Sequence, residues 1–136
     1  MTSKEKAYIG GIIDSKGSIM LLKSNNNELP SPCISISSTS IELLKWIKDV
    51  SKMGSIKNKE NSNSEKHANS FIYTIKHNDT INLLLEIEPY LIVKSKKKKA
   101  KLILEKYKAV TPRNGRYSNE MLKAKEQFYE DFISIK

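Results

Sequence analysis

The most constraining feature of this sequence is a pattern that occurs twice, in which one helical segment is followed by two short strand-like segments. The first helix is expected to follow Ser3 as its N-cap and to end near Gly17, and the second to cover 41–50 after Thr39 or Ser40. The four expected strands are 18–24, 33–38, 55–59 and 70–76. Strands adjacent in sequence pair as antiparallel hairpins, whereas parallel neighbours need a crossover helix. The pattern therefore predicts an α+β fold, an antiparallel four-stranded sheet with helices packed on one face.

Further helices follow this αββαββ arrangement. A third helix is expected to begin after Asn78 or Asp79 and to end before Pro89. Two more are expected over about 95–110 and 118–135, where apolar residues recur at helical spacing. The sheet is thus expected to be followed by an entirely helical C-terminal part.

Length and composition fit one domain, which we assign to residues 1–136 with a core over about 3–110. Of the 136 residues, 38% are hydrophobic, which is enough for one core. Cys33, the single cysteine, cannot form an internal disulfide, and two histidines do not complete a zinc site. No apolar run approaches the roughly 20 residues of a membrane span, and no signal peptide follows Met1. We expect an intracellular protein of the cytoplasm, nucleoid or an organelle, without membrane association or a structural metal.

The charge balance favours a polyanionic partner. Lys and Arg number 24 against 15 Asp and Glu, which gives a net charge of +9. Such a surplus attracts nucleic acid and disfavours acidic partners, and an anionic membrane surface is the weaker alternative.

One face of the expected sheet is polar and cationic. Counting every second residue places on it hydroxyl and lysine side chains together with Met20, Leu22, Cys33 and Ile72. The candidates for DNA contact on this face are Ser24, Ser35, Ser37, Ser55, Lys57, Lys59, Thr74 and Lys76. A pleated sheet can lie in the major groove and present donors and acceptors to base edges. The alternative is an ordinary solvated face.

Two adjacent glycines, Gly10 and Gly11, lie in the middle of the first helix. Each costs roughly 1 kcal/mol relative to Ala in a helix interior, so a close backbone contact is expected to compensate. That contact is made either with a second copy of the chain, which gives a two-fold dimer, or with the chain's own sheet.

Residues 8–19, Tyr-Ile-Gly-Gly-Ile-Ile-Asp-Ser-Lys-Gly-Ser-Ile, resemble the signature of LAGLIDADG homing endonucleases, with 9–17 filling its nine positions. The αββαββ order, Gly-Ser-Ile at 54–56 and Glu-Pro-Tyr-Leu-Ile-Val-Lys at 88–94 are also similar to that family. A single motif in a short chain is typical of the homodimeric members, in which two motif helices meet at the two-fold axis and two sheets form a saddle over DNA. The resemblance implies a dimer interface at Tyr8, Gly10, Gly11 and Ile13.

The sequence departs from the family at Lys16. There the family has an acidic residue that binds the divalent metal used for cleavage. An ammonium cannot ligate Mg²⁺ and repels it, so no cofactor is expected, and Mg²⁺ is implied only if the chain cleaves. In an active enzyme, Asp14 or backbone carbonyls would have to carry the metal, but Asp14 lies two residues before Lys16, which is about 200° of helix rotation. Lys16 instead has two interpretations, a phosphate contact or a cation that favours the helix end.

Other positions follow from the resemblance or from charge. By resemblance, Lys94 corresponds to a basic residue that positions the nucleophilic water or stabilises charge, and Ser38 lies near a polar position that contacts that water. The run 94–101 holds six lysines, among which Lys96, Lys97 and Lys98 are expected phosphate contacts or parts of a solvated face. Arg113 and Arg116 flank Asn-Gly and are expected to contact the DNA backbone from a turn.

Four functions are compatible with the sequence. The preferred one is a homodimeric, sequence-specific double-stranded DNA-binding protein in which Lys16 has abolished or weakened cleavage. The second is an active Mg²⁺-dependent homing endonuclease that makes a double-strand break. The third is an RNA-binding maturase that assists intron folding, and the fourth is a basic protein-interaction module.

Overall fold

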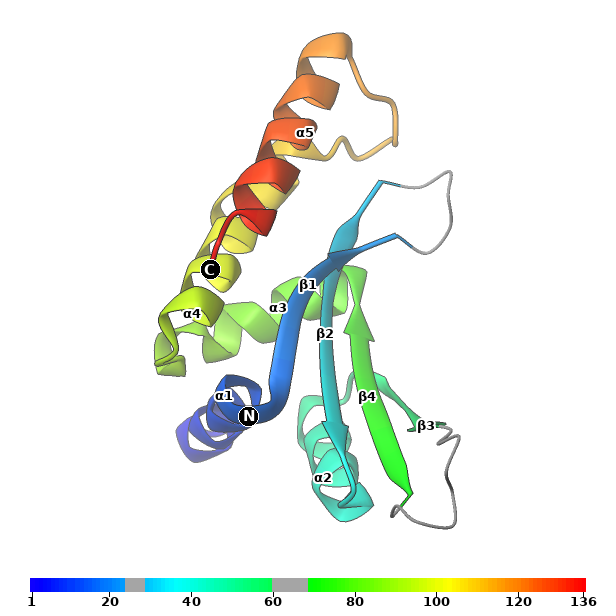
Figure 1. Ribbon diagram of the computed structural model, residues 1–136, viewed down its shortest axis with the longest axis vertical. Helices are drawn as coiled ribbons and strands as arrows, with labels where there is room; N and C mark the ends of the chain where they lie inside the picture. Colours follow the sequence, from blue (N-terminus) through cyan, green and yellow to red (C-terminus); the bar gives the residue numbers. More distant parts are fainter. Residues whose placement is uncertain (24–28, 60–68) are drawn as a thin grey trace.

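The computed structural model describes residues 1–23, 29–59 and 69–136. Helices and strands alternate largely as the sequence predicts (Figure 1). The elements of the repeated pattern are α1 (Ser3–Lys16), β1 (Gly17–Leu22), β2 (Ser31–Ser38), α2 (Ile41–Ser51), β3 (Ser55–Lys59) and β4 (Ser70–Lys76). The helical C-terminal part consists of α3 (His77–Ile87), η1 (Glu88–Tyr90), α4 (Lys94–Leu102), η2 (Ile103–Tyr107), η3 (Lys108–Val110) and α5 (Asn119–Ile133). The helix expected over 95–110 is thus regular only in its first half.

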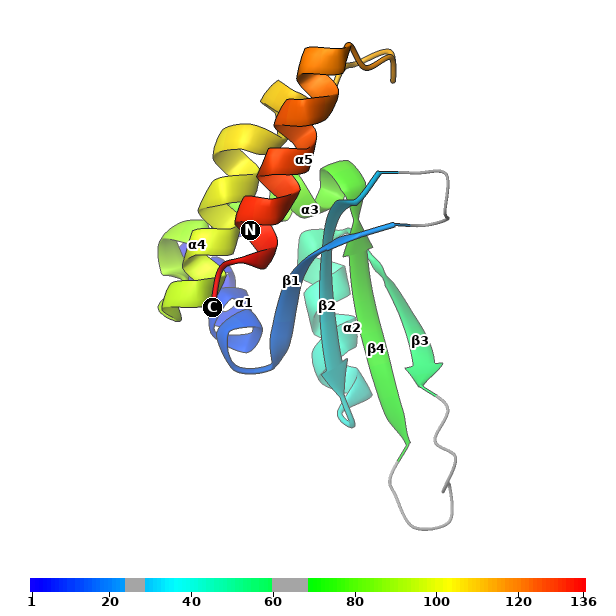
Figure 2. The ribbon, with the colours of Figure 1, turned by 45° about the horizontal axis from the view of Figure 1, so that its top comes forward.

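The four strands form one antiparallel sheet in the order β1-β2-β4-β3. The two hairpins therefore meet through β2 and β4, which lie at the centre of the sheet. Helices pack on one side of it, and Figure 2 shows the other side of the four strands uncovered by helices. The α+β prediction, with an antiparallel sheet and helices on one face, is confirmed.

The core lies between the sheet and the helices. Its fully buried side chains include Ile9 and Ile13 of α1, Ile34 and Ile36 of β2, and Leu84 of α3. They alternate along the strands and recur every three to four residues in the helices, as a two-layer core requires. This packing fixes which sheet face is covered.

The C-terminal helices extend this core. In both ribbon views α5 runs alongside α4 and the segment that follows it. Phe128 and Phe132 of α5 are buried in the same cluster as Ala100 and Ile103. The N-cap of α5 is Ser118, whose Oγ accepts a hydrogen bond from the Met121 amide at 3.1 Å.

The expected helix starts were wrong by one residue at α1 and by two or three residues at α3. Thr2, not Ser3, caps α1, because Glu5 stands three positions after it and completes a capping box. α3 begins directly after β4 at His77 instead of after Asn78 or Asp79. It is fixed by the Thr80 hydroxyl, which donates to the Pro32 carbonyl at 3.2 Å.

The bounds of β1 and β2 differ from those expected from the sequence. β1 ends at Leu22, and Ser24, placed on its extension, lies outside the described residues. β2 begins at Ser31, two residues before the expected start. In the described part of the chain, no helix has the length and apolar character that membrane crossing requires.

Candidate nucleic-acid interface

The strand register places the predicted polar residues on one sheet face. Ser35 pairs with Thr74, which pairs in turn with Ser55, so these three form one row across the sheet. The neighbouring rows bring together Ser37 with Ile72 and Lys57, Lys59 with Ser70, and Cys33 with Met20 and Lys76. All seven described sheet candidates thus lie on the face opposite to the core, which we call the open face.

The open face combines cations with hydroxyl groups. Lys57, Lys59 and Lys76 are exposed, and within the described residues none of them forms an ion pair or a hydrogen bond. Ser37 and Ser55 are also exposed, and hydroxyls both donate and accept hydrogen bonds. Chemically, this face can attract a phosphate backbone and contact base edges.

Cys33 is the exception on the open face. Although its strand position predicts a surface residue, it is 2% exposed. Burial raises the pKa of its thiol, against a smaller lowering by the positive charge of Lys76. A raised pKa keeps the thiol protonated, and the thiolate is the reactive form. We therefore interpret Cys33 as a structural residue of low reactivity.

Asp14, near the end of α1, bonds to two backbone amides. Its two carboxylate oxygens accept hydrogen bonds from the amides of Ile92 at 2.9 Å and Val93 at 3.1 Å. These amides directly precede α4, so Asp14 stabilises the positive end of that helix. These bonds give Asp14 a structural role, whereas its use as a metal ligand, considered from the sequence only for an active enzyme, stays a prediction.

Lys96 of α4 bonds in turn to the end of α1. Its ammonium donates to the carbonyl oxygens of Ile13 at 2.8 Å and Asp14 at 2.7 Å. The expectation that Lys96 is a surface phosphate contact does not fit these bonds. No local pattern in the sequence signals them, because Asp14 and Lys96 are far apart along the chain.

The residues around the end of α1 do not fit a divalent metal. Lys16 is exposed in the last turn, so two ammonium groups and an already bonded carboxylate are the charged groups placed there. Among the described residues, no three His, Cys, Asp or Glu side chains gather as a metal site. Cations attract neither Mg²⁺ nor Mn²⁺, and these metals need free oxygen ligands.

Ser38 and Lys94, the other two predicted catalytic residues, differ in their surroundings. Ser38 is 6% exposed, and its Oγ accepts a hydrogen bond from the Ser40 amide at 3.0 Å. It thereby shapes the turn that leads into α2, for which a helix-flanking hydroxyl suffices. Lys94 is exposed at the first position of α4, and it directly follows the amides bound to Asp14.

The remaining lysines of α4 are not equivalent. Lys99 lies 5.7 Å from the centroid of the Phe132 ring, and Lys101 lies 4.0 Å from a carboxylate oxygen of Glu88. Lys98 is exposed and Lys97 is half-buried. Only part of the lysine run thus faces solvent in the way that a phosphate-contact patch requires.

The two arginines lie on an exposed turn between η3 and α5. Arg113 and Arg116 are both exposed, and the Asn114 side chain accepts a hydrogen bond from the Arg116 amide at 3.0 Å. Gly115 has φ +71°, which favours glycine. The turn presents both guanidinium groups to solvent, as the Asn-Gly signal predicts.

The two glycines of α1 have different surroundings. A Cβ on Gly10 would lie 3.2 Å from Cβ of Tyr90, so this glycine permits a close contact with η1 of the same chain. A Cβ on Gly11 would meet no described atom within 4 Å. The contact of Gly10 within the chain is thus with η1 and not with the sheet, whereas a contact of Gly11 with a second copy stays a prediction.

Of the other two predicted interface residues, one is available to a partner. Tyr8 is 57% exposed and packs edge-on against Trp46, with ring centroids 4.9 Å apart. Ile13 is 0% exposed and belongs to the core, so the expectation that it meets a second chain is corrected.

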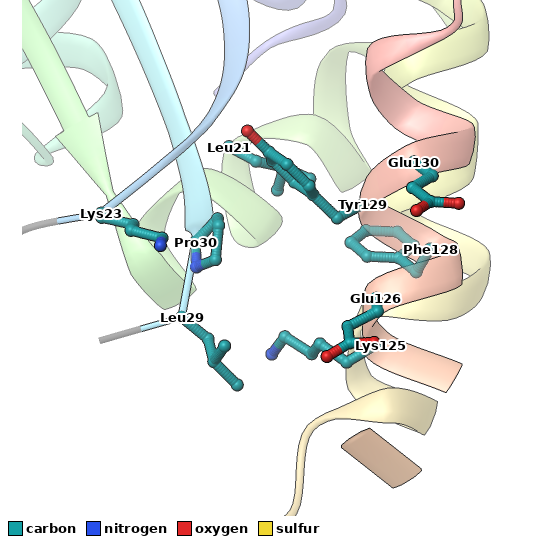
Figure 3. Close-up of a pocket in the computed structure, with 9 residues that line it drawn as sticks. All are labelled: Leu21, Lys23, Leu29, Pro30, Lys125, Glu126, Phe128, Tyr129 and Glu130. Atoms are coloured by element: carbon teal, nitrogen blue, oxygen red, sulfur yellow. The ribbon is translucent and has the colours of Figure 1, made fainter. Parts of the chain in front are cut away.

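A cavity of about 290 Å³ lies between the β1–β2 hairpin and α5 (Figure 3). It is mainly apolar, and Glu126 and Glu130 stand at its edge. Two carboxylates disfavour a phosphate, so we do not assign the cavity to the nucleic-acid interface.

Lys125 at this cavity is a feature that sequence reasoning missed. It is 4% exposed, and its ammonium donates to the hydroxyls of Thr111 at 2.7 Å and Tyr117 at 2.9 Å. The same nitrogen lies 4.3 Å from the centroid of the Tyr107 ring. The sequence could have indicated the burial of Lys125, because Lys125 precedes Phe128 by three residues and so lies on the buried stripe of α5.

Comparisons with known proteins identify the fold. No protein-family model matches the sequence, and no curated protein matches it either. Among solved structures, an archaeal intron-encoded homing endonuclease, I-Vdi141I, complexed with DNA is 19% identical with a TM-score of 0.65, over 98% of this chain and 84% of that one. The homing endonuclease I-TnaI is 12% identical with a TM-score of 0.67, over 100% and 90% of the two chains.

A third similar structure is longer than this chain. The LAGLIDADG homing endonuclease I-GzeII in complex with its DNA target is 18% identical with a TM-score of 0.65, over 96% of this chain. This chain spans 49% of the length of I-GzeII. At these identities, the similarity establishes that the chain has the fold of LAGLIDADG homing endonucleases.

Proposed function

We propose that this chain, which has the LAGLIDADG homing-endonuclease fold, is a sequence-specific double-stranded DNA-binding protein. The observation that carries the proposal is the open face, where exposed lysines and hydroxyls share one side of a four-stranded sheet. A positively charged sheet face meets the two requirements of such a protein, electrostatic attraction to phosphates and polar groups for base edges. Similar structures that contain bound DNA support the same interpretation.

The proposed active unit is a homodimer that uses the outer side of α1. Gly11 is exposed there without a described neighbour, and Tyr8 is exposed beside it on the same helix. A glycine in mid-helix that no contact with the described residues explains is accounted for by a close approach of a second helix. A two-fold dimer of this kind predicts a nearly palindromic DNA site.

Metal-dependent cleavage is proposed to be lost or strongly weakened. Lys16 stands where the family resemblance implies an acid, Asp14 is bonded to two amides, and Lys96 adds a second positive charge. Among the described residues, those at the end of α1 are two lysines and a carboxylate already bonded to amides, a set that repels a divalent metal more than it ligates one.

The test is selection of a binding site from a pool of randomised duplexes, with a pool of structured RNA in parallel. We expect enrichment of duplexes with two-fold symmetry and a steep decrease of affinity with salt. Enrichment of structured RNA alone would identify a maturase and refute the proposal. A salt-independent affinity would contradict the role of the lysines.

Cleavage is tested on the selected duplex with Mg²⁺ or Mn²⁺. We expect the natural chain to leave the duplex intact and Lys16→Asp to gain cutting, with Lys16→Asn as the uncharged control of similar size. Strong cutting by the natural chain would refute the proposed loss of activity.

A further inference from the structure

The carbonyl end of α1 is bonded to a side chain from α4. The last four carbonyls of a helix lack partners within the helix and carry a partial negative charge. In α1, the Ile13 carbonyl accepts a hydrogen bond from the Gly17 amide. The Lys96 ammonium adds a bond of 2.8 Å to that oxygen and a bond of 2.7 Å to the Asp14 carbonyl.

The bonds between the two helix ends are reciprocal. Asp14 of α1 accepts from the two amides that precede α4, while Lys96 of α4 donates to the two carbonyls near the end of α1. Each charged side chain thus faces the helix end of opposite sign. Charge-assisted hydrogen bonds are about twice as strong as neutral ones, so four of them at one point define a rigid junction.

We propose that Lys96 is a positioning residue, a resident cation at the carbonyl end of α1 that fixes the orientation of α1 against α4 and does not contact DNA. The Ile13 and Asp14 carbonyl oxygens that it bonds to are hydrogen-bond acceptors, and an ammonium supplies the donors that they lack at the end of the helix. The inference goes beyond the proposed function, because it assigns to one lysine of the run a role opposite to that of its neighbours.

The junction controls both proposed contact surfaces. α1 carries Tyr8 and Gly11 on its outer side, and β1 of the sheet begins directly at Gly17. A change in the direction of α1 therefore alters how two sheets of a dimer are aligned over one DNA duplex. The part of the inference that concerns DNA rests on the proposed function, whereas the junction itself does not.

The test compares Lys96→Met, which keeps the apolar stem, with Lys96→Arg, which keeps the charge. Lys98→Met is the matched control, because Lys98 is exposed on the same helix. We expect Lys96→Met to lower Tm of the full chain by about 3–8 °C. It should also weaken binding to the selected duplex about tenfold while leaving the slope of log Kd against log salt unchanged. Lys96→Arg should restore part of both losses.

Lys98→Met should behave in the opposite way if Lys98 contacts phosphate. Its Tm should stay within about 1 °C, and its salt slope should decrease by about 0.9 for each contact removed. The inference is overturned if Lys96→Met keeps the natural Tm and shows that decrease in slope, because Lys96 would then be a phosphate contact.

A double-mutant cycle with Asp14→Asn separates this inference from the proposed function. Both residues act at one junction, so the Tm loss of the double variant should be clearly smaller than the sum of the single losses. Additive losses would contradict the junction. The cycle needs no DNA, so it tests the junction even if the chain binds no duplex, and Lys96→Arg replaces Lys96→Met in it if the latter does not fold.

Discussion

The open face of the sheet and the end of α1 both present lysines, but these lysines have different surroundings. On the open face, Lys57 and Lys59 extend into solvent, whereas Lys96 at the end of α1 is half-buried and bonded to two carbonyl oxygens. The difference shows that a lysine-rich sequence is not a uniform electrostatic surface. An ammonium that is bonded to carbonyl oxygens still adds to the net charge, but it is less available for a direct phosphate contact than an exposed one.

The largest expected effect comes from removing the cations of the open face. Replacing Lys57, Lys59 and Lys76 together by Ala should weaken duplex binding by roughly 100-fold at physiological salt, because each lost phosphate contact lowers the salt slope by about 0.9. Tm should change little, since these side chains have no described partner. Fluorescence anisotropy over a salt series measures both the affinity and its slope, and a thermal melt measures Tm.

The control for this triple variant is Lys45→Ala with Lys48→Ala on α2. Both lysines are exposed but belong to a helix on the covered side of the sheet. The control removes two charges instead of three, so an equal loss of binding free energy per lysine removed would show that total charge, not the open face, governs binding.

Lys125 is buried, in contrast to the exposed lysines of the open face. Lys125→Ala removes a buried stem from between aromatic rings and leaves two hydroxyls without their donor. We expect a loss of about 2–3 kcal/mol in the free energy of unfolding, measured by urea denaturation. Lys123→Ala on the same helix is exposed and should stay within about 0.5 kcal/mol. Equal stability of the two variants would contradict a structural role for Lys125.

The sequence predicts the fold better than the roles of its lysines. Alternation of Ile34 and Ile36 with polar residues, and the helical spacing in α1 and α2, are local signals that follow directly from burial on one side. The pairing of β2 with β4 is not local, because each hairpin specifies only its own two strands. Period two nonetheless predicts the side on which the described sheet candidates lie, because it fixes the face without knowledge of the strand order.

The predictions that the structure corrects concern contacts between distant segments. Asp14 and Lys96 each fit a surface or site role by motif or charge, and only the packing of α4 against α1 shows that they bond to each other's helix ends. The same holds for Ile13, which the resemblance assigns to an interface and which the core of the chain buries. Composition and spacing carry no information on such pairs.

A smaller effect is expected at the two glycines of α1. Gly11→Ala should stabilise the monomer by up to about 1 kcal/mol through helix propensity, because a Cβ there meets no described atom. The same change should weaken self-association if Gly11 lies at the two-fold axis. Sedimentation velocity over a concentration series measures the second effect.

Gly10→Ala is the matched control for this variant. Its Cβ would lie 3.2 Å from Tyr90, so the gain in propensity should be offset by crowding against η1, and self-association should not change. A dimer that tolerates Gly11→Ala but is weakened by Gly10→Ala would contradict the proposed interface.

The smallest expected effect separates the two lysines at the end of α1. Lys16 is exposed in the last turn, where a cation contributes about 0.3–1 kcal/mol through the helix dipole. Lys16→Met should therefore lower Tm by less than about 3 °C, and if Lys16 contacts phosphate it should weaken binding about fivefold and lower the salt slope by about 0.9 per contact.

Lys96→Met should give the reverse, a larger loss of Tm with an unchanged slope. The two variants together test whether two lysines near the end of α1 have different roles, one at the surface and one in the junction. If both variants lose stability alike and neither changes the slope, the end of α1 does not contact DNA at all. The contrast between the open face and the junction would then become stronger, because every phosphate contact would have to come from the sheet and its flanking turns. If both change the slope alike, the carbonyl bonds of Lys96 do not persist when DNA is bound, and the contrast fails.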